Sequence, residues 1–133
     1  MRNSGGMWVC VPVAALVGAL SGCGVLDVRA DADAAVEAWV RDTGETDPCR
    51  IDAMQHCVGA SVAAAAYGPH WALLLGQLLE LQQGDGDPMD LHNNEAGVNC
   101  AAAITGESSG AVACCEDMLN AHPSPLRTDG RCE

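Results

Sequence analysis

The cysteines restrict how this chain can fold more than any other feature. Eight occur in 133 residues, and six of them lie beyond residue 48: Cys49, Cys57, Cys100, Cys114, Cys115 and Cys132. An even number of cysteines in a small exported domain predicts up to three disulfides, whose pairing the sequence does not choose. Adjacent Cys114 and Cys115 are expected to have different partners, because a bond between neighbours strains the peptide. Zinc is the alternative, but the chain has no Cys-x-x-Cys pair.

The first residues carry the signals of an exported lipoprotein. A short segment with Arg2 precedes an apolar run at 9–20, which has the length of a secretory signal. The run ends in Leu20-Ser21-Gly22-Cys23, which resembles the lipobox of bacterial lipoproteins. That resemblance implies that Cys23 becomes the lipidated first residue of the mature protein. An uncleaved membrane anchor is the alternative, but the run is shorter than the roughly 20 residues that cross a bilayer.

We therefore expect a signal peptide at 1–22, a lipidated tether at 23–30 and a helical domain at 31–133. Cys10 falls within the signal. Gly24, not Asp, follows the lipidation site, so nothing obvious retains the protein at an inner membrane. The expected location is the cell envelope, with the protein anchored to the membrane through Cys23. It would lie at the outer membrane, face the periplasm or reach the cell surface.

Charge and composition argue against several classes of partner. The chain has six arginines, no lysine and 18 acidic residues, which gives a formal net charge of -12. Nucleic acid is not an expected partner, because phosphate contacts need a basic surface. With no Phe, one Tyr and three Trp, the core must consist of Ala, Leu, Val and Met. Such a core buries little apolar area at roughly 25 cal/mol per Å², so reinforcement by disulfides is expected.

Helical periodicity and helix-ending residues predict an all-α fold, a compact bundle of four to five short helices reinforced by disulfides. No alternating strand pattern occurs. The expected helices span 31–41, 49–66, 69–81, 89–104 and 109–121. The third is rich in Leu and is expected to be central. The tail to residue 133 is expected to be irregular and held by Cys132.

A polar stripe marks the expected fourth helix. Asp90, Asn93, Asn94 and Gly97 follow the spacing i, i+3, i+4 and i+7, which usually carries the apolar side that faces the core. A buried acid and two buried amides need partners, because an unpaired buried polar group costs roughly 1–3 kcal/mol. The stripe therefore predicts a site that faces a pocket. His92 points away from Asp90 and ranks below the other residues.

The second and third helices supply candidate partners. Asp52 and His56 are four residues apart and share a helix face, where a carboxylate can orient an imidazole and raise its pKa. The same spacing can present both to a metal, and a simple surface ion pair is the alternative. Glu80 interrupts the Leu-rich helix, either at its solvent edge or as a partly buried acid with a raised pKa. Gly76, one turn earlier, leaves room for a close neighbour.

Other signatures of catalysis or metal binding are absent or incomplete. The chain has no GxSxG, no HExxH and no glycine-rich phosphate loop. Asp85-Gly86-Asp87 resembles the start of an EF-hand, but Met89 and Ala96 stand where calcium ligands are required. Calcium binding is therefore not expected at this loop.

The ordered motifs resemble an uncharacterised family of secreted bacterial domains with the pattern D-x-x-x-H, a central Glu and D-x-x-N-N-x-x-G. The same family occurs at the C-terminal ends of Rhs-type polymorphic toxins. The resemblance covers about 49–105, and it is carried by Asp52-Ala-Met-Gln-His56-Cys57, Tyr67-Gly68-Pro69, Glu80 and residues 89–97. The pattern is more distantly similar to bacterial Wnt-like domains, grouped with a helical superfamily proposed to act on lipids or lipid head groups. Gln55 and Leu79 stand where the family often has a basic residue and a His.

The resemblance implies one polar pocket lined by Asp52, His56, Glu80, Asp90 and Asn94, with Asn93 beside it. In a lipid-directed hydrolase or transferase, His56 would be general base or nucleophile, oriented by Asp52. Glu80 and Asp90 would be acid/base groups or metal ligands, and Asn93 and Asn94 would hold the substrate or an oxyanion. A divalent cation is a candidate cofactor.

Two other functions stay open at this point. The protein could be a non-catalytic binding or structural lipoprotein whose polar stripe is a buried hydrogen-bond network. It could also be a toxin-like effector. The expected partners are the membrane, through the lipid on Cys23, and a lipid or other envelope ligand.

Overall fold

The computed structural model describes residues 23–83, 87–104, 108–130 and 132, and all the regular structure in these ranges is helical. The elements are α1 (Cys23–Thr43), α2 (Pro48–Tyr67), α3 (Pro69–Gln83), α4 (Pro88–Val98), the 3-10 turn η2 (Ala101–Ala103) and α5 (Ser109–Asn120). The predicted all-α, disulfide-reinforced bundle is confirmed. Among the helices described, none combines the length and the apolar character needed to cross a bilayer.

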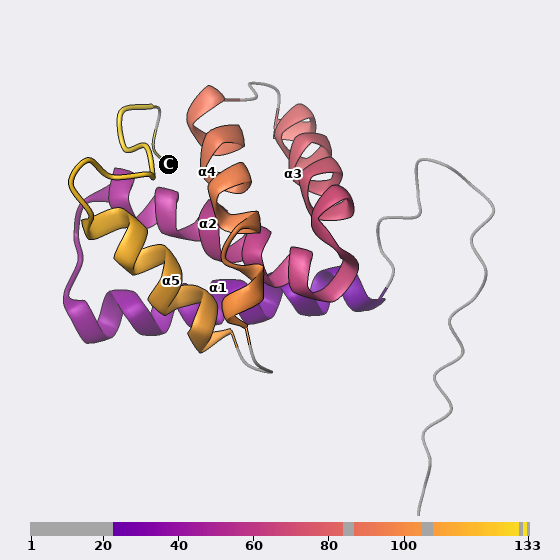
Figure 1. Cartoon of the computed structure of the whole chain (residues 1–133), viewed down its shortest axis with the longest axis horizontal. Helices are drawn as coiled ribbons and strands as arrows, with labels where there is room; N and C mark the ends of the chain where they lie inside the picture. Colours follow the sequence, from indigo (N-terminus) through magenta and orange to yellow (C-terminus); the bar gives the residue numbers. More distant parts are fainter. Residues whose placement is uncertain (1–22, 84–86, 105–107, 131, 133) are drawn as a thin grey trace, which may run out of the picture.

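The centre of the bundle is α2, which packs against α1, α3, α4 and α5. In Figure 1 it crosses the middle of the molecule, with α1 below it and α3 and α4 above. Its ends follow the local sequence. The Asp47 carboxylate accepts a hydrogen bond from the Cys49 N–H at 2.9 Å, Pro48 occupies the first turn, and Gly68 ends the helix with φ 91°.

The prediction that the Leu-rich helix is central is wrong, because α3 lies at the edge of the bundle and packs mainly against α2 and α4 (Figure 1). Trp71 is 61% exposed and Leu81 is 73% exposed. Apolar residues occur on every side of α3, but a helix at an edge buries only one stripe. The stripe that α3 buries includes the small Ala72 and the acidic Glu80.

The apolar core forms mainly where α1, α2 and α5 meet. Small alanine and half-cystine side chains fill it together with larger Val, Met, Leu and Trp side chains. Its buried members are Ala32, Val36, Trp39, Ala53, Met54, Cys57, Val58, Cys100, Ala111, Cys115, Leu119 and Leu126. Because the small side chains let the helices approach α2 closely, the core is built around α2 and not around α3.

Three disulfides tie the bundle together. They are Cys49–Cys132, from α2 to the C-terminal segment, Cys57–Cys115, from α2 to α5, and Cys100–Cys114, from the start of η2 to α5. The two adjacent cysteines therefore have different partners and the tail is held, as predicted. The sulfurs of Cys57, Cys100 and Cys115 lie within 4.8 Å of one another, but each belongs to a disulfide and none is a free thiolate.

Two helix boundaries differ from the prediction by more than two residues. The first helix begins at Cys23 and not at Asp31, so the segment expected to be a tether is helical. Neither Gly nor Pro interrupts the chain from Val25 to Thr43, and Arg29 pairs with Asp33 one turn along at 3.7 Å. The fourth helix ends at Val98 and tightens into η2 instead of continuing to 104. The predicted signal peptide at 1–22 lies outside the described residues, and lipidation of Cys23 stays a prediction.

A close contact at Gly97 joins α4 to α2. A Cβ at this position would overlap the carbonyl oxygen of Cys57. The Ser61 hydroxyl lies 2.7 Å from the carbonyl oxygens of both Cys57 and Gly97. This contact turns the polar stripe of α4 toward α2, and it explains why the stripe ends in a glycine.

Candidate functional site

A cluster of polar side chains lies where α2, α3 and α4 meet, with His56 at its centre. We call it the His56 cluster, and its members are Asp52 and His56 from α2, Glu80 from α3, and Asp90 and Asn94 from α4. The structure thus brings together five candidate residues that lie far apart in the sequence. These are the residues that the motif resemblance placed in one pocket.

Both ring nitrogens of His56 face oxygen atoms. Nε2 lies 3.4 Å from Oδ1 of Asp90 and 3.7 Å from Oδ1 of Asp52. Nδ1 lies 3.3 Å from Oδ1 of Asn94 and 3.7 Å from Oε1 of Glu80. Because the Asn94 amide oxygen can only accept, the ring donates through Nδ1–H in this hydrogen bond. Nε2 faces the two aspartates.

Burial distinguishes the imidazole from the acids around it. The His56 side chain keeps 21% of its surface exposed, whereas that of Glu80 keeps 6%. The Asp52 and Asp90 side chains keep 11% and 13%, so the imidazole is the most exposed of these four titratable side chains.

Burial also changes the acidity of two carboxyl groups. Desolvation raises the pKa of Asp52 to about 6, against the attraction of His56 and with the repulsion of Asp90. Desolvation likewise raises the pKa of Glu80 to about 7, with His56 and Asp90 acting in the same opposing senses. Both groups thus titrate close to neutral pH, where a proton can be gained and lost at little cost.

When the carboxyl groups are ionised, two buried oxygens in the cluster accept no hydrogen bond, namely Oδ2 of Asp52 and Oδ1 of Asp90. Asp52 and Asp90 are 8% and 9% exposed. A protonated Asp52 or Glu80 can share a hydrogen bond with Asp90, which is one cause of their raised pKa values. A buried polar atom without a partner costs roughly 1–3 kcal/mol, so a network that served only to hold helices together should satisfy its members. The cluster instead retains unused capacity to bind a proton donor or a cation.

Local sequence explains how α4 presents its stripe. The Asp87 carboxylate caps the helix by accepting a hydrogen bond from the Met89 N–H at 2.9 Å, and Pro88 starts the first turn. Asp90 and Asn94 then share one face, one turn apart. On α3, a Cβ at Gly76 would lie 2.8 Å from Nδ2 of Asn94. The room predicted at Gly76 is therefore filled by Asn94.

Asn93 is buried beside the cluster but faces the C-terminal segment. Its amide donates to the Arg127 carbonyl oxygen at 2.9 Å, and its oxygen accepts from the Arg127 N–H at 2.8 Å. Both polar ends of the side chain are thus engaged in holding the tail against α4. The sequence did not reveal this partner, because nearly every residue has the same backbone groups and none marks itself as the one that Asn93 contacts. His92 lies on the exposed side, with Nε2 2.8 Å from the Pro125 carbonyl oxygen.

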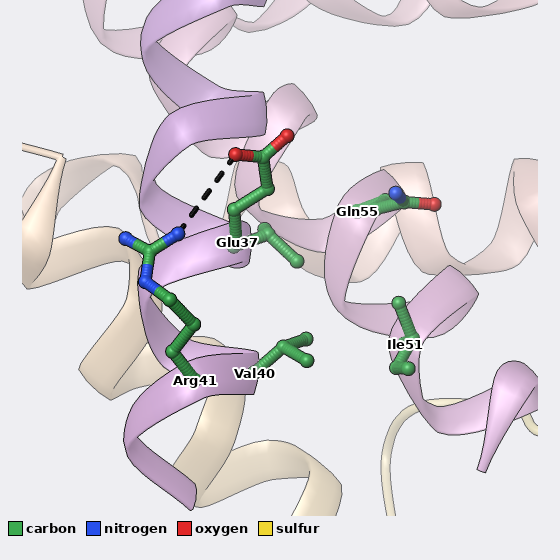
Figure 2. Close-up of a pocket in the computed structure, with 6 residues that line it drawn as sticks. Glu37, Val40, Arg41, Ile51 and Gln55 are labelled. Atoms are coloured by element: carbon green, nitrogen blue, oxygen red, sulfur yellow. Dashed lines mark ion pairs between the residues drawn. The ribbon is translucent and has the colours of Figure 1, made fainter. Parts of the chain in front are cut away.

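A separate hollow lies between α1 and α2, as Figure 2 shows. It is lined by Val36, Glu37, Val40, Arg41, Ile51 and Gln55. Glu37 and Arg41 form an ion pair at 4.0 Å along α1. The hollow offers apolar walls, this ion pair and one amide, but no imidazole and no thiol. Its side chains give no set for acid–base catalysis, so the His56 cluster is the stronger candidate site.

No protein-family model matches the chain, and comparisons with curated proteins and with solved structures find no match. The candidate site is therefore defined by the geometry of the His56 cluster.

Proposed function

We propose that the His56 cluster is the active site of a cell-envelope hydrolase or transferase that acts on lipids or lipid head groups. One observation carries the proposal. A partly exposed imidazole lies among three buried carboxyl groups, and two of these have pKa values raised to about 6 and about 7. Groups that differ in burial and titrate near neutrality are suited to general acid–base catalysis.

Each member of the cluster has a role in this proposal. His56 is the general base or the nucleophile: in the neutral tautomer that donates from Nδ1 to Asn94, Nε2 carries the lone pair. Asp52, one turn before His56, orients the ring and stabilises its charged form. Glu80 is protonated in a large fraction of molecules at pH 7 and can act as the acid. Asp90 is a second acid/base group.

The choice of a lipid substrate is supported by sequence and by the surface of α3. The lipobox-like segment ending at Cys23 would hold the protein at a membrane, and the motif resemblance points to lipid-linked substrates. Trp71, Leu74 and Leu81 are exposed on α3, the helix that also carries Glu80. At about 100° per residue these side chains lie on the side of α3 away from the buried Glu80, where they could contact a membrane surface.

A non-catalytic binding or structural role is the second candidate. It is favoured by the hydrogen bond at 3.3 Å from His56 to Asn94, which links α2 to α4. The buried oxygens of Asp52 and Asp90 that accept no hydrogen bond argue against a network built for stability alone.

The test uses the full chain, produced in an oxidising compartment and purified in detergent. It is incubated with envelope phospholipids, and released head groups and lipid products are measured by mass spectrometry. We expect turnover by the parent, a loss of about 10²-fold or more in His56→Gln, and full turnover in His92→Gln as the matched control. Glu80→Gln provides a second variant of the cluster, and circular dichroism verifies that each variant is folded. Absence of turnover in the parent, or turnover unchanged in folded His56→Gln, would overturn the proposal.

A further inference from the structure

Three side chains of the His56 cluster converge as ligands of a metal ion would. One ligand atom each from Asp52, His56 and Asp90 lies within 4.8 Å of the others. Ligands about 2.1 Å from a metal, at angles of about 110–125°, lie roughly 3.4–3.7 Å apart. Nε2 of His56 lies 3.4 Å from Asp90 Oδ1 and 3.7 Å from Asp52 Oδ1. We propose that a divalent cation, Zn²⁺ or Mn²⁺, binds between α2 and α4 through these three side chains.

The buried oxygens supply an independent observation. Oδ1 of Asp90, the atom nearest to Nε2, accepts no hydrogen bond, and neither does Oδ2 of Asp52. Asp52 and Asp90 are buried, with 8% and 9% of each residue exposed, and each places its Oδ1 atom beside Nε2 of His56. An ion between them would provide the partner that the protein itself does not.

The negative charge of the cluster also favours the binding of a cation. When Asp52, Glu80 and Asp90 are ionised, their charges outnumber the one positive charge that the imidazole of His56 can provide. Each arginine that the structure describes is paired elsewhere: Arg29 with Asp33, Arg41 with Glu37, Arg50 with Glu45 and Arg127 with Asp129. Buried charges are stable when they are paired or bound to a metal.

The groups on the other side of the ring suit a ligating histidine. Such a histidine usually donates its second N–H to a carboxylate or a carbonyl oxygen, which fixes the ring. Nδ1 of His56 faces Oδ1 of Asn94 at 3.3 Å and Oε1 of Glu80 at 3.7 Å. One imidazole and two carboxylates favour Zn²⁺ or Mn²⁺ over Ca²⁺ and Mg²⁺, which take oxygen ligands.

This inference rests on the same pocket as the proposed function and refines it. A bound ion would supply Lewis-acid chemistry toward a phosphoryl oxygen or a water molecule. With Nε2 engaged as a ligand, His56 would hold the ion and would not itself be the general base or nucleophile, so the inference changes the role of His56 in the proposed function.

The test is metal binding by the full chain in detergent, after treatment with a chelator and its removal. Zn²⁺ and Mn²⁺ are titrated by calorimetry, and bound Mn²⁺ is examined by electron paramagnetic resonance for coupling to an imidazole nitrogen. We expect one ion per chain and a loss of affinity of about 10-fold in Glu80→Gln. Asp52→Asn and Asp90→Asn remove direct ligands, so their metal affinity should fall by more than roughly 100-fold. That value is the upper range for residues that contact a ligand and not the metal, as Glu80 does.

Asp129→Asn, which removes an exposed carboxylate outside the cluster, is the matched control and should bind as the parent does. Circular dichroism shows that the variants are folded. No binding by the parent, equal affinity in folded Asp52→Asn and Asp90→Asn, or an equal loss in Asp129→Asn would overturn the inference. Ion binding without lipid turnover would overturn only the proposed function. Turnover in the presence of chelator, by a protein that binds no ion, would overturn only this inference.

Discussion

The carbonyl oxygen of Cys57 occupies the position where a side chain at Gly97 would begin. The backbones of α2 and α4 therefore touch here, two turns of α4 beyond Asp90. This contact sets the distance between the helices that carry most of the His56 cluster. It also yields a direct test of the packing.

Gly97→Ala should destabilise the protein by about 1–3 kcal/mol, because the new methyl group meets backbone that cannot rotate away. Urea unfolding followed by circular dichroism measures the free energy of unfolding. The matched control is Gly59→Ala in α2, where an added Cβ has no neighbour within 4 Å. That change should stabilise the helix by up to about 1 kcal/mol. Equal unfolding free energies for the two variants would contradict the close contact.

Asn93→Ala should release the C-terminal segment from α4. It leaves the N–H and the carbonyl oxygen of Arg127 without partners, at a cost of roughly 1–3 kcal/mol. Hydrogen exchange at the Arg127 amide should become faster, and the free energy of unfolding should fall. The control, Asn99→Ala, changes an exposed amide at a helix end and should leave that exchange rate as it is. Unchanged exchange in Asn93→Ala would contradict the assigned contact.

Leu119→Ala and Leu81→Ala should differ strongly, although both remove the same atoms. Leu119 on α5 is 3% exposed, so its truncation should cost about 2–5 kcal/mol. Leu81 on α3 is 73% exposed, so its truncation should change stability by less than about 0.5 kcal/mol. Thermal unfolding of the two variants checks the finding that α3 lies at the edge. A large loss of stability in Leu81→Ala would contradict the position of α3 at the edge of the bundle.

In the presence of chelator, the protein should lose stability as the pH rises from about 4 to about 7. The folded-state pKa values of Asp52 and Glu80, about 6 and about 7, exceed the ordinary values of 3.8 and 4.5 for these side chains. Folding therefore favours the protonated forms. The two groups contribute their full stabilisation below the pKa values of the unfolded chain. This stabilisation is lost as the pH rises through the pKa values of the folded protein.

Asp52→Asn removes the ionisation and should raise the melting temperature more at pH 8 than at pH 4.5. Melting curves across this range give the difference from the parent. Asp117→Asn, on the exposed side of α5, should follow the parent at every pH. A melting-temperature difference between Asp52→Asn and the parent that does not change with pH would show that Asp52 is not buried as described.

Residues with a regular spacing explain what the sequence could predict. The i, i+4 relation of Asp52 and His56, and the polar stripe through Asp90 and Asn94, depend only on the helical repeat. Glu80 was recognisable because an acid is conspicuous in a Leu-rich helix. Once these segments are helical and packed together, their polar faces need polar partners, and the other polar faces provide them.

Features set by tertiary contact could not be predicted in the same way. The Leu content of α3 does not reveal which of its sides is covered, and Trp71 is exposed although it is large and apolar. Asn93 shows the same limit, because its partner is the backbone of Arg127, which any residue would provide. The pairing of the cysteines likewise depends on which helices lie side by side.

The helical form of α5 selects the disulfide partners. Adjacent residues on a helix point about 100° apart, so Cys115 turns into the core toward Cys57 while Cys114 turns sideways toward Cys100. In an unfolded chain the two neighbouring thiols would be nearly interchangeable, and either could react with either partner. Oxidation before α5 has formed would therefore scramble the pairs, whereas oxidation afterwards would sort them. Because the two cysteines are neighbours, correct pairing requires that α5 be helical before they are cross-linked.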